Sequence, residues 1–182
     1  MQGPRSERSG RPDGRRVVFV TALGFWLSLG AAAEPERKGN AAAVADVAAF
    51  VRWPDTAEYG LSFRLCLRDD DPAFGEFVRE RDATVQGKPL TVHSMQPAQF
   101  GRMPCHIAYF SPGYADPVIL KRLNNQPTLT VSPERGFASH GGLVELNRDG
   151  GRLVLVMDRA ALPSHPLAFS AQLLAISHQA GE

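Results

Sequence analysis

Hydrophobic positions along residues 41–132 recur at two alternating spacings, one helical and one strand-like. Residues 41–53 (AAAVADVAAFVRW) have the helical spacing, and Pro54 is expected to end this helix because the residue before a proline is pushed out of the α region. A further helix is predicted at residues 116–123. Strands are predicted at residues 61–68, 88–94, 107–110 and 128–131. This β-α-β alternation favours an α/β layer architecture.

Two of these strands carry more specific expectations. Residues 107–110 (IAYF) form an unbroken apolar run, which predicts burial on both faces, as in the middle of a parallel sheet. In the run 88–94, Leu90 and Val92 are expected to share one face.

The three consecutive acids Asp69, Asp70 and Asp71 precede Pro72 and suggest the start of a second helix. Asp71 can accept a hydrogen bond from a free amide as the N-cap, and Pro72 suits the first helical position because its missing N–H costs nothing there. A cation site is the alternative interpretation of three adjacent acids. We favour the cap because Phe74, Phe77 and Val78 continue at helical spacing.

The last third of the chain has a different pattern, because strands at 143–147 and 153–157 flank the turn sequence RDGGR. Asp149-Gly150 is a strong signal for a two-residue hairpin turn, so the sheet should be mixed, with an antiparallel hairpin in the C-terminal half. Gly141-Gly142 precedes a strand and is interpreted as a flexible approach to the hairpin, since a phosphate loop would lead into a helix. A last helix is expected at 167–178, with Leu167, Ala171 and Leu174 on its buried face.

The first 33 residues have the pattern of a secretory signal peptide. Five arginines precede an apolar run at 17–29, and small residues follow at Gly30 to Ala33. The run has 13 residues, which is short for a membrane span of about 20, although a retained anchor is the alternative. Arg15-Arg16 is compatible with twin-arginine export and equally with an ordinary charged n-region. We expect cleavage after Ala33, a disordered stretch at 34–40, and one α/β domain at 41–182 without a membrane span.

Charge excludes one class of partner. The whole chain of 182 residues has a formal net charge of +1, and removal of residues 1–33, with their five arginines and two acids, changes it to −2. Nucleic-acid binding requires a concentrated positive face, so no nucleic-acid partner is expected.

The two cysteines, Cys66 and Cys105, are interpreted as a structural disulfide, because an even cysteine count in an exported protein favours a bond that persists in an oxidising compartment. His106 follows Cys105 directly, but neighbours along a strand point to opposite faces, so this histidine should not activate the thiol. The five histidines show no ligand pair at close spacing. We therefore predict no catalytic residues, no metal site and no cofactor.

Seven segments, in order and spacing, resemble the YfiR family of periplasmic proteins. They are FVRWP at 50–54, LCL at 65–67 with DPAFG at 71–75, GKPLTV at 87–92, CHIAYF at 105–110, LTV at 129–131, Gly141-Gly142, and SAQLLA at 170–175. The resemblance covers essentially the whole mature chain.

The resemblance implies a periplasmic regulator, often dimeric, that represses an inner-membrane diguanylate cyclase by binding its periplasmic region. Repression would lower cyclic di-GMP and biofilm formation. Cys66 and Cys105 match one disulfide pair of the family's best-known member, but a second pair has no counterpart here, which leaves redox control open. Asp158 stands where asparagine is common.

The alternative function is a periplasmic small-molecule-binding module that serves another membrane sensor. For the regulator, the candidate contact surfaces are the helix at 41–53, which includes the Trp53-Pro54 corner, and the C-terminal helix around 170–176. Either surface is expected to serve the core and a partner or second copy. Interface residues, the signal and the partner's identity stay open.

Overall fold

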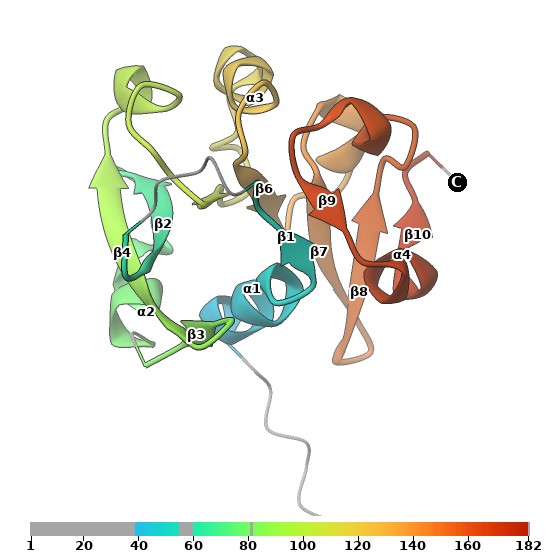
Figure 1. The fold of residues 1–182 in the computed structure, drawn as a ribbon, viewed down its shortest axis with the longest axis horizontal. Helices are drawn as coiled ribbons and strands as arrows, with labels where there is room; N and C mark the ends of the chain where they lie inside the picture. The colour runs from blue at the N-terminus through green and yellow to red at the C-terminus, as the bar shows by residue number, and fades with distance from the viewer. Residues whose placement is uncertain (1–38, 55–59, 81, 182) are drawn as a thin grey trace, which may run out of the picture. The chain divides into compact units, whose positions relative to one another are not determined.

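The computed structural model describes residues 39–54, 60–80 and 82–181. These residues form a mixed eight-stranded sheet and a separate two-stranded sheet (Figure 1). The order of the large sheet is β10-β8-β7-β6-β5-β2-β4-β3. The expected α/β class with a mixed sheet is therefore confirmed.

The middle of the large sheet is parallel and follows the predicted strands. Its strands are β4 (Lys88–Met95), β2 (Phe63–Arg68), β5 (Ile107–Tyr109), β6 (Leu129–Ser132) and β7 (Val144–Asp149). All three residues of β5 are buried, which confirms the expectation of a strand covered on both faces. Leu90 and Val92 both contact the same core cluster, as expected from their alternation.

At the two ends of the sheet, the strand pairs are antiparallel or only two residues long. The hairpin β7–β8 (Arg152–Met157) pairs Asp149 with Arg152, so the turn residues are Gly150 and Gly151. Their φ angles of 53° and 82° satisfy a turn that needs positive φ at both positions. The turn is thus shifted by one residue from the predicted Asp149-Gly150, because glycine adopts positive φ more cheaply than aspartate. The outer strands are β3 (Thr84–Val85) and β10 (His178–Gln179).

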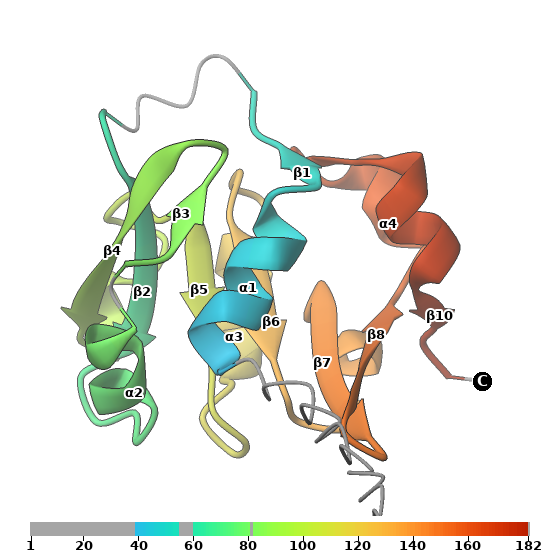
Figure 2. The same ribbon diagram turned by 90° about the horizontal axis from the view of Figure 1, so that it is seen from below.

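Helices cover both faces of the middle strands. The helices α1 (Asn40–Ala48) and α2 (Phe74–Arg79) pack in one hydrophobic cluster with Leu65, Tyr109 and Val131. The helix α3 (Pro117–Leu123) packs in a second cluster with Cys66, Ala108 and Phe110. Figures 1 and 2 show α1 and α3 on opposite sides of β5 and β6. Strand alternation explains the division, because successive side chains enter opposite layers.

Short one-turn segments complete the described chain. They are the 3₁₀ helices η1 (Pro97–Gln99), η2 (Ala138–His140) and η3 (Leu162–Ser164).

Asp116 caps α3, since its Oδ1 accepts hydrogen bonds from the amides of Val118 (2.7 Å) and Ile119 (3.3 Å).

The first helix is shorter at its C-terminal end than predicted. It ends at Ala48, and residues 51 and 52 form β1 (Val51–Arg52), which pairs antiparallel with β9 (Ala168–Phe169). Figure 2 shows β1 leaving the end of α1 and reaching the red C-terminal segment. Long-range pairing therefore overrides the local helical spacing, and the β-branched, fully buried Val51 suits a strand.

The N-terminal expectations lie mainly outside the described residues, which include neither the signal peptide at 1–33 nor residues 34–38. Asn40, the last residue of the expected disordered stretch, is helical. Its amide donates to Glu76 Oε1 at 3.0 Å, so this residue is held by α2.

The last helix is also shorter than predicted. It is α4 (Ala171–Ile176), capped by Ser170, whose Oγ accepts from the amide of Leu173 at 3.1 Å. Leu173 is its buried residue, whereas Ala171 is exposed and Leu174 half-buried. Leu167 is buried but precedes the helix. The helix begins later than predicted because residues 168 and 169 form β9 and pair with β1.

Candidate functional site

The disulfide joins two adjacent parallel strands. Cys66 lies in β2, and Cys105 lies two residues before β5, which pairs with β2 through Leu65 and Ile107. The bond spans 39 positions of sequence with a Cα–Cα distance of 6.1 Å, within the range that a disulfide can bridge. The structure thus contains the disulfide that the sequence predicted.

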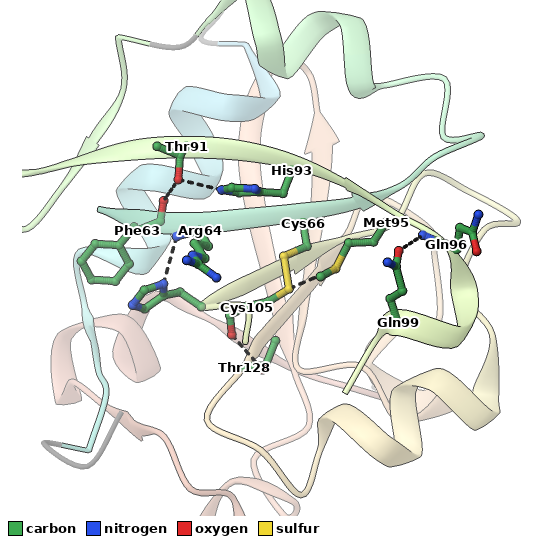
Figure 3. The surroundings of a disulfide bond; sticks show 11 residues. Phe63, Arg64, Cys66, Thr91, His93, Met95, Gln96, Gln99, Cys105 and Thr128 are labelled. Atoms are coloured by element: carbon green, nitrogen blue, oxygen red, sulfur yellow. Dashed lines mark hydrogen bonds between the residues drawn. A yellow bond between two sulfur atoms is a disulfide. The ribbon is translucent and has the colours of Figure 1, made fainter. Parts of the chain in front are cut away.

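The surroundings of this disulfide exclude solvent. Cys66 is 0% exposed and Cys105 1% exposed. Met95 Sδ lies 3.4 Å from Cys105 Sγ, a packing contact, because a disulfide sulfur carries no hydrogen (Figure 3). Thr128 Oγ1 donates to the Cys105 carbonyl at 2.9 Å. A reductant can reach this bond only after the sheet opens locally, which suits a structural role.

His106 lies on the other side of the sheet from this bond. Its ring packs at 4.4 Å from Phe63 and 5.9 Å from Trp53, both of the α1-side cluster, whereas Cys105 belongs to the α3-side cluster. His106 Nδ1 accepts a hydrogen bond from the Arg64 amide at 2.9 Å. This arrangement agrees with the expectation that the histidine does not activate Cys105.

The electrostatic environment keeps His106 neutral. Burial, together with the positive charges of Lys88 and Arg64, lowers the pKa of His106 to about 4. A histidine with this pKa stays uncharged at neutral pH and serves here as a hydrogen-bond acceptor in the aromatic cluster.

Asp71 is the most extensively bonded carboxylate of the predicted acidic run. Its Oδ1 accepts from the Ala73 amide (2.9 Å) and from Ser111 Oγ (2.6 Å), and its Oδ2 accepts from the Ser111 amide (3.0 Å). Asp71 therefore stabilises the turn before α2, but the prediction that it is the N-cap is wrong, because α2 begins at Phe74 and its N-cap is Ala73, without a side-chain capping bond. Asp70 instead pairs with Arg68 at 2.7 Å on the surface.

Sequence reasoning missed Ser111 as the second partner of Asp71. The sequence feature that could have indicated it is a polar residue directly after the apolar run 107–110, at the end of a strand that neighbours β2.

Among the described residues, no group of three or more histidine, cysteine, aspartate or glutamate side chains is placed to hold a metal ion.

The two predicted contact surfaces differ in exposure. Six of the nine residues of α1 are buried, so this helix belongs to the core and offers little surface to a partner. The Trp53 ring, at the predicted corner, is half-buried against Phe63 at 5.0 Å.

The α4 surface, by contrast, is open. Ala171 and Ala175 are exposed, and Ile176 is 59% exposed. Leu174 lines an apolar groove with residues of the preceding segment, which include Pro166, Leu167 and Phe169. Ala171, Leu174 and Ala175 have the spacing of one helix face, so this face borders the groove.

A family model described as YfiR/HmsC-like matches residues 37–178. No curated protein matches the chain. Within the described residues, no helix has both the length and the apolar character that a membrane crossing requires.

Proposed function

The chain belongs to the YfiR/HmsC-like family, and on this premise we propose that it is a periplasmic regulator that represses an inner-membrane diguanylate cyclase. It would act by binding the periplasmic region of that enzyme and would thereby lower cyclic di-GMP and biofilm formation. The observation that carries the proposal is the family match, which extends over residues 37–178.

The arrangement of the described residues supports binding over chemistry. Cys105 is held in a buried disulfide, and His106 faces the opposite side of the sheet. A regulator without a reaction of its own holds a partner inactive by binding the inactive state more tightly than the active one. A rigid domain suits this task, because little conformational entropy is then lost on binding.

We assign the partner contact to the exposed side of α4 that includes Ile176, since α1 is occupied by the core. An exposed apolar side chain provides surface that a protein partner can bury. Ile176 is the largest exposed hydrophobic residue of this helix. Val118 on α3 is 66% exposed and provides a matched control on another element.

The experiment combines a gene deletion with point variants. Deletion should raise cyclic di-GMP and surface attachment, and wild-type protein should restore low levels. Ile176→Glu should fail to restore them and should lose binding to the purified periplasmic segment of a cyclase encoded beside the gene, whereas Val118→Glu should behave as wild type. Unchanged cyclic di-GMP in the deletion strain, together with no binding to that segment, would refute the regulator.

We also propose that two copies associate, as the family resemblance implies. Analytical ultracentrifugation of the purified protein should give the mass of a dimer, and a monomer at all concentrations would contradict this part of the proposal.

A further inference from the structure

A cavity of about 220 Å³ lies between three segments that are far apart in the sequence. Asn124 at the end of α3 forms one wall, the Gly141-Gly142 loop before β7 forms a second, and the segment after β8 forms a third with Asp158, Ala161 and His165. The cavity is smaller than a drug-sized pocket of about 300 Å³ or more, so only a small molecule fits.

The glycine wall of this cavity is tightly constrained. A side chain on Gly142 would lie 2.1 Å from the ring of Phe137, and Gly141 has a φ of 96°. Both positions therefore require glycine, and the Gly141 carbonyl is held by a hydrogen bond from Asn124 Nδ2 at 2.8 Å. The loop presents a fixed surface to the cavity.

Asn124 contributes an acceptor without a partner. Because its Nδ2 donates to the Gly141 carbonyl, the other terminal atom of the amide must be the oxygen. This Oδ1 atom is buried and makes no hydrogen bond. A buried acceptor without a donor costs roughly 1–3 kcal/mol, so it is a place where a bound molecule gains affinity.

His165 contributes the complementary donor. Its Nδ1 accepts from the Leu167 amide at 3.1 Å, and burial lowers the pKa of this histidine to about 4, so the neutral ring carries its proton on Nε2. That Nε2 atom is also buried without a hydrogen-bond partner. Of the three buried side-chain polar atoms without a partner among the described residues, two therefore belong to residues that line this cavity, and His165 also lines the groove beside α4.

The charge of the lining decides which molecules are accepted. Asp158 is the charged residue among those that line the cavity, and no lysine or arginine joins it there. One carboxylate oxygen of Asp158 accepts from the Ala160 amide at 3.0 Å. Phosphates and carboxylates are anions and would be repelled by Asp158, whereas an ammonium group would leave the His165 donor unmatched.

We propose that this cavity binds a small uncharged polyhydroxyl compound, such as a monosaccharide or a polyol. A hydroxyl group both donates and accepts, so a polyhydroxyl compound suits a lining that contains the Asn124 Oδ1 acceptor and the His165 Nε2 donor. Further hydroxyl groups can donate to the Asp158 carboxylate. The proposal concerns binding by this chain alone and does not depend on the cyclase partner.

The test is an NMR titration of the isotopically labelled protein with D-glucose, D-ribose and glycerol, and separately with inorganic phosphate. We expect at least one neutral probe to cause saturable shifts of the Asn124 side-chain amide and the His165 ring, and phosphate to cause none. No saturable shift up to about 0.1 M, roughly a hundred times a Kd of 1 mM, would refute the proposal and leave water as the occupant. A saturable response to phosphate alone would also refute it.

Two variants locate the binding. His165→Phe keeps an aromatic ring but removes the Nε2 donor, together with the Nδ1 acceptor of the Leu167 amide, and it should weaken binding at least tenfold. Ala161→Trp places a large ring at the exposed rim and should block the cavity without touching the core, whereas Ala160→Trp, at an exposed neighbour that does not line the cavity, should bind as the wild type does. Binding unchanged in both His165→Phe and Ala161→Trp would overturn the assignment to this cavity.

Discussion

Asp71 and Ser111 lie 40 positions apart and are joined by two hydrogen bonds, from the serine amide and from its hydroxyl to the two carboxylate oxygens. The Asp71 side chain also holds the Ala73 amide, and the residue is 4% exposed. The pair ties the turn that leads into α2 to the segment that follows β5. It therefore couples a local turn to the packing of two neighbouring strands.

Asp71→Asn should lower the free energy of unfolding by about 2–4 kcal/mol. An amide group would direct N–H groups at donors that now face an oxygen, and each buried donor left unsatisfied costs roughly 1–3 kcal/mol. Ser111→Ala should cost less, about 1 kcal/mol, because it removes one of the bonds. Urea unfolding followed by circular dichroism measures both.

Asp69→Asn is the matched control for this pair of variants, because it removes the same charge at an exposed position in the same acidic run. We expect it to leave the unfolding midpoint nearly unchanged. Equal midpoints for Asp69→Asn and Asp71→Asn would show that the buried hydrogen bonds contribute nothing.

The disulfide should stabilise the domain strongly and resist reduction in the native state. In the chain-entropy model, closing a loop of 39 positions adds about 4 kcal/mol to the free energy of unfolding. A Cys66→Ala, Cys105→Ala double variant should therefore melt at a temperature lower by roughly 10 °C. Differential scanning calorimetry measures this change. Because the disulfide leaves neither cysteine with a free thiol, a maleimide should label none in the native protein, and labelling of both would contradict the assignment.

Stability should fall as the pH decreases from about 6.5 to about 4. The folded-state pKa of His106 is lowered to about 4 by burial, while an unfolded histidine has a pKa of about 6.5. Between these values the unfolded state binds more protons than the folded state, so protonation favours unfolding. Burial lowers the pKa of His165 to about 4 as well, so both residues contribute to the same window.

Urea midpoints at pH 7 and pH 5 test this expectation. His106→Gln keeps an acceptor for the Arg64 amide but cannot be protonated, so its midpoint should change less between the two pH values. His178→Gln, at an exposed position, serves as the control and should retain the wild-type slope. A pH dependence as steep in His106→Gln as in wild type would exclude His106 as a source.

The mature protein should begin near Glu34, because Ala31 and Ala33 provide the small residues that signal peptidase requires. Mass spectrometry of a periplasmic extract identifies the N-terminus. Ala33→Phe should leave the leader attached, whereas Ala41→Ser, beyond the expected cleavage region, should not. An intact N-terminus of wild-type protein in the membrane fraction would favour the retained anchor.

The sequence by itself determined the elements whose evidence is local. The apolar run 107–110 indicated a strand buried on both faces, and the helix predicted at 116–123 is present as α3, which begins at Pro117. The cysteine pairing also followed from the sequence, because an exported chain with two cysteines has one possible intramolecular bond. The family resemblance pointed to the same architecture and was confirmed by the match over residues 37–178.

Only the tertiary structure decided the features that depend on partners distant in the chain. Val51 carries the periodicity of a helix, yet it becomes a strand because Phe169 offers it a backbone partner. Asp71 meets Ser111 because the parallel neighbours β2 and β5 bring their ends together, and Asn124 lines one cavity with His165 although 41 positions separate them. Spacing along a sequence reports which face a residue occupies, but not which segment covers that face, since the pairing of distant strands is set by the packing of the whole domain.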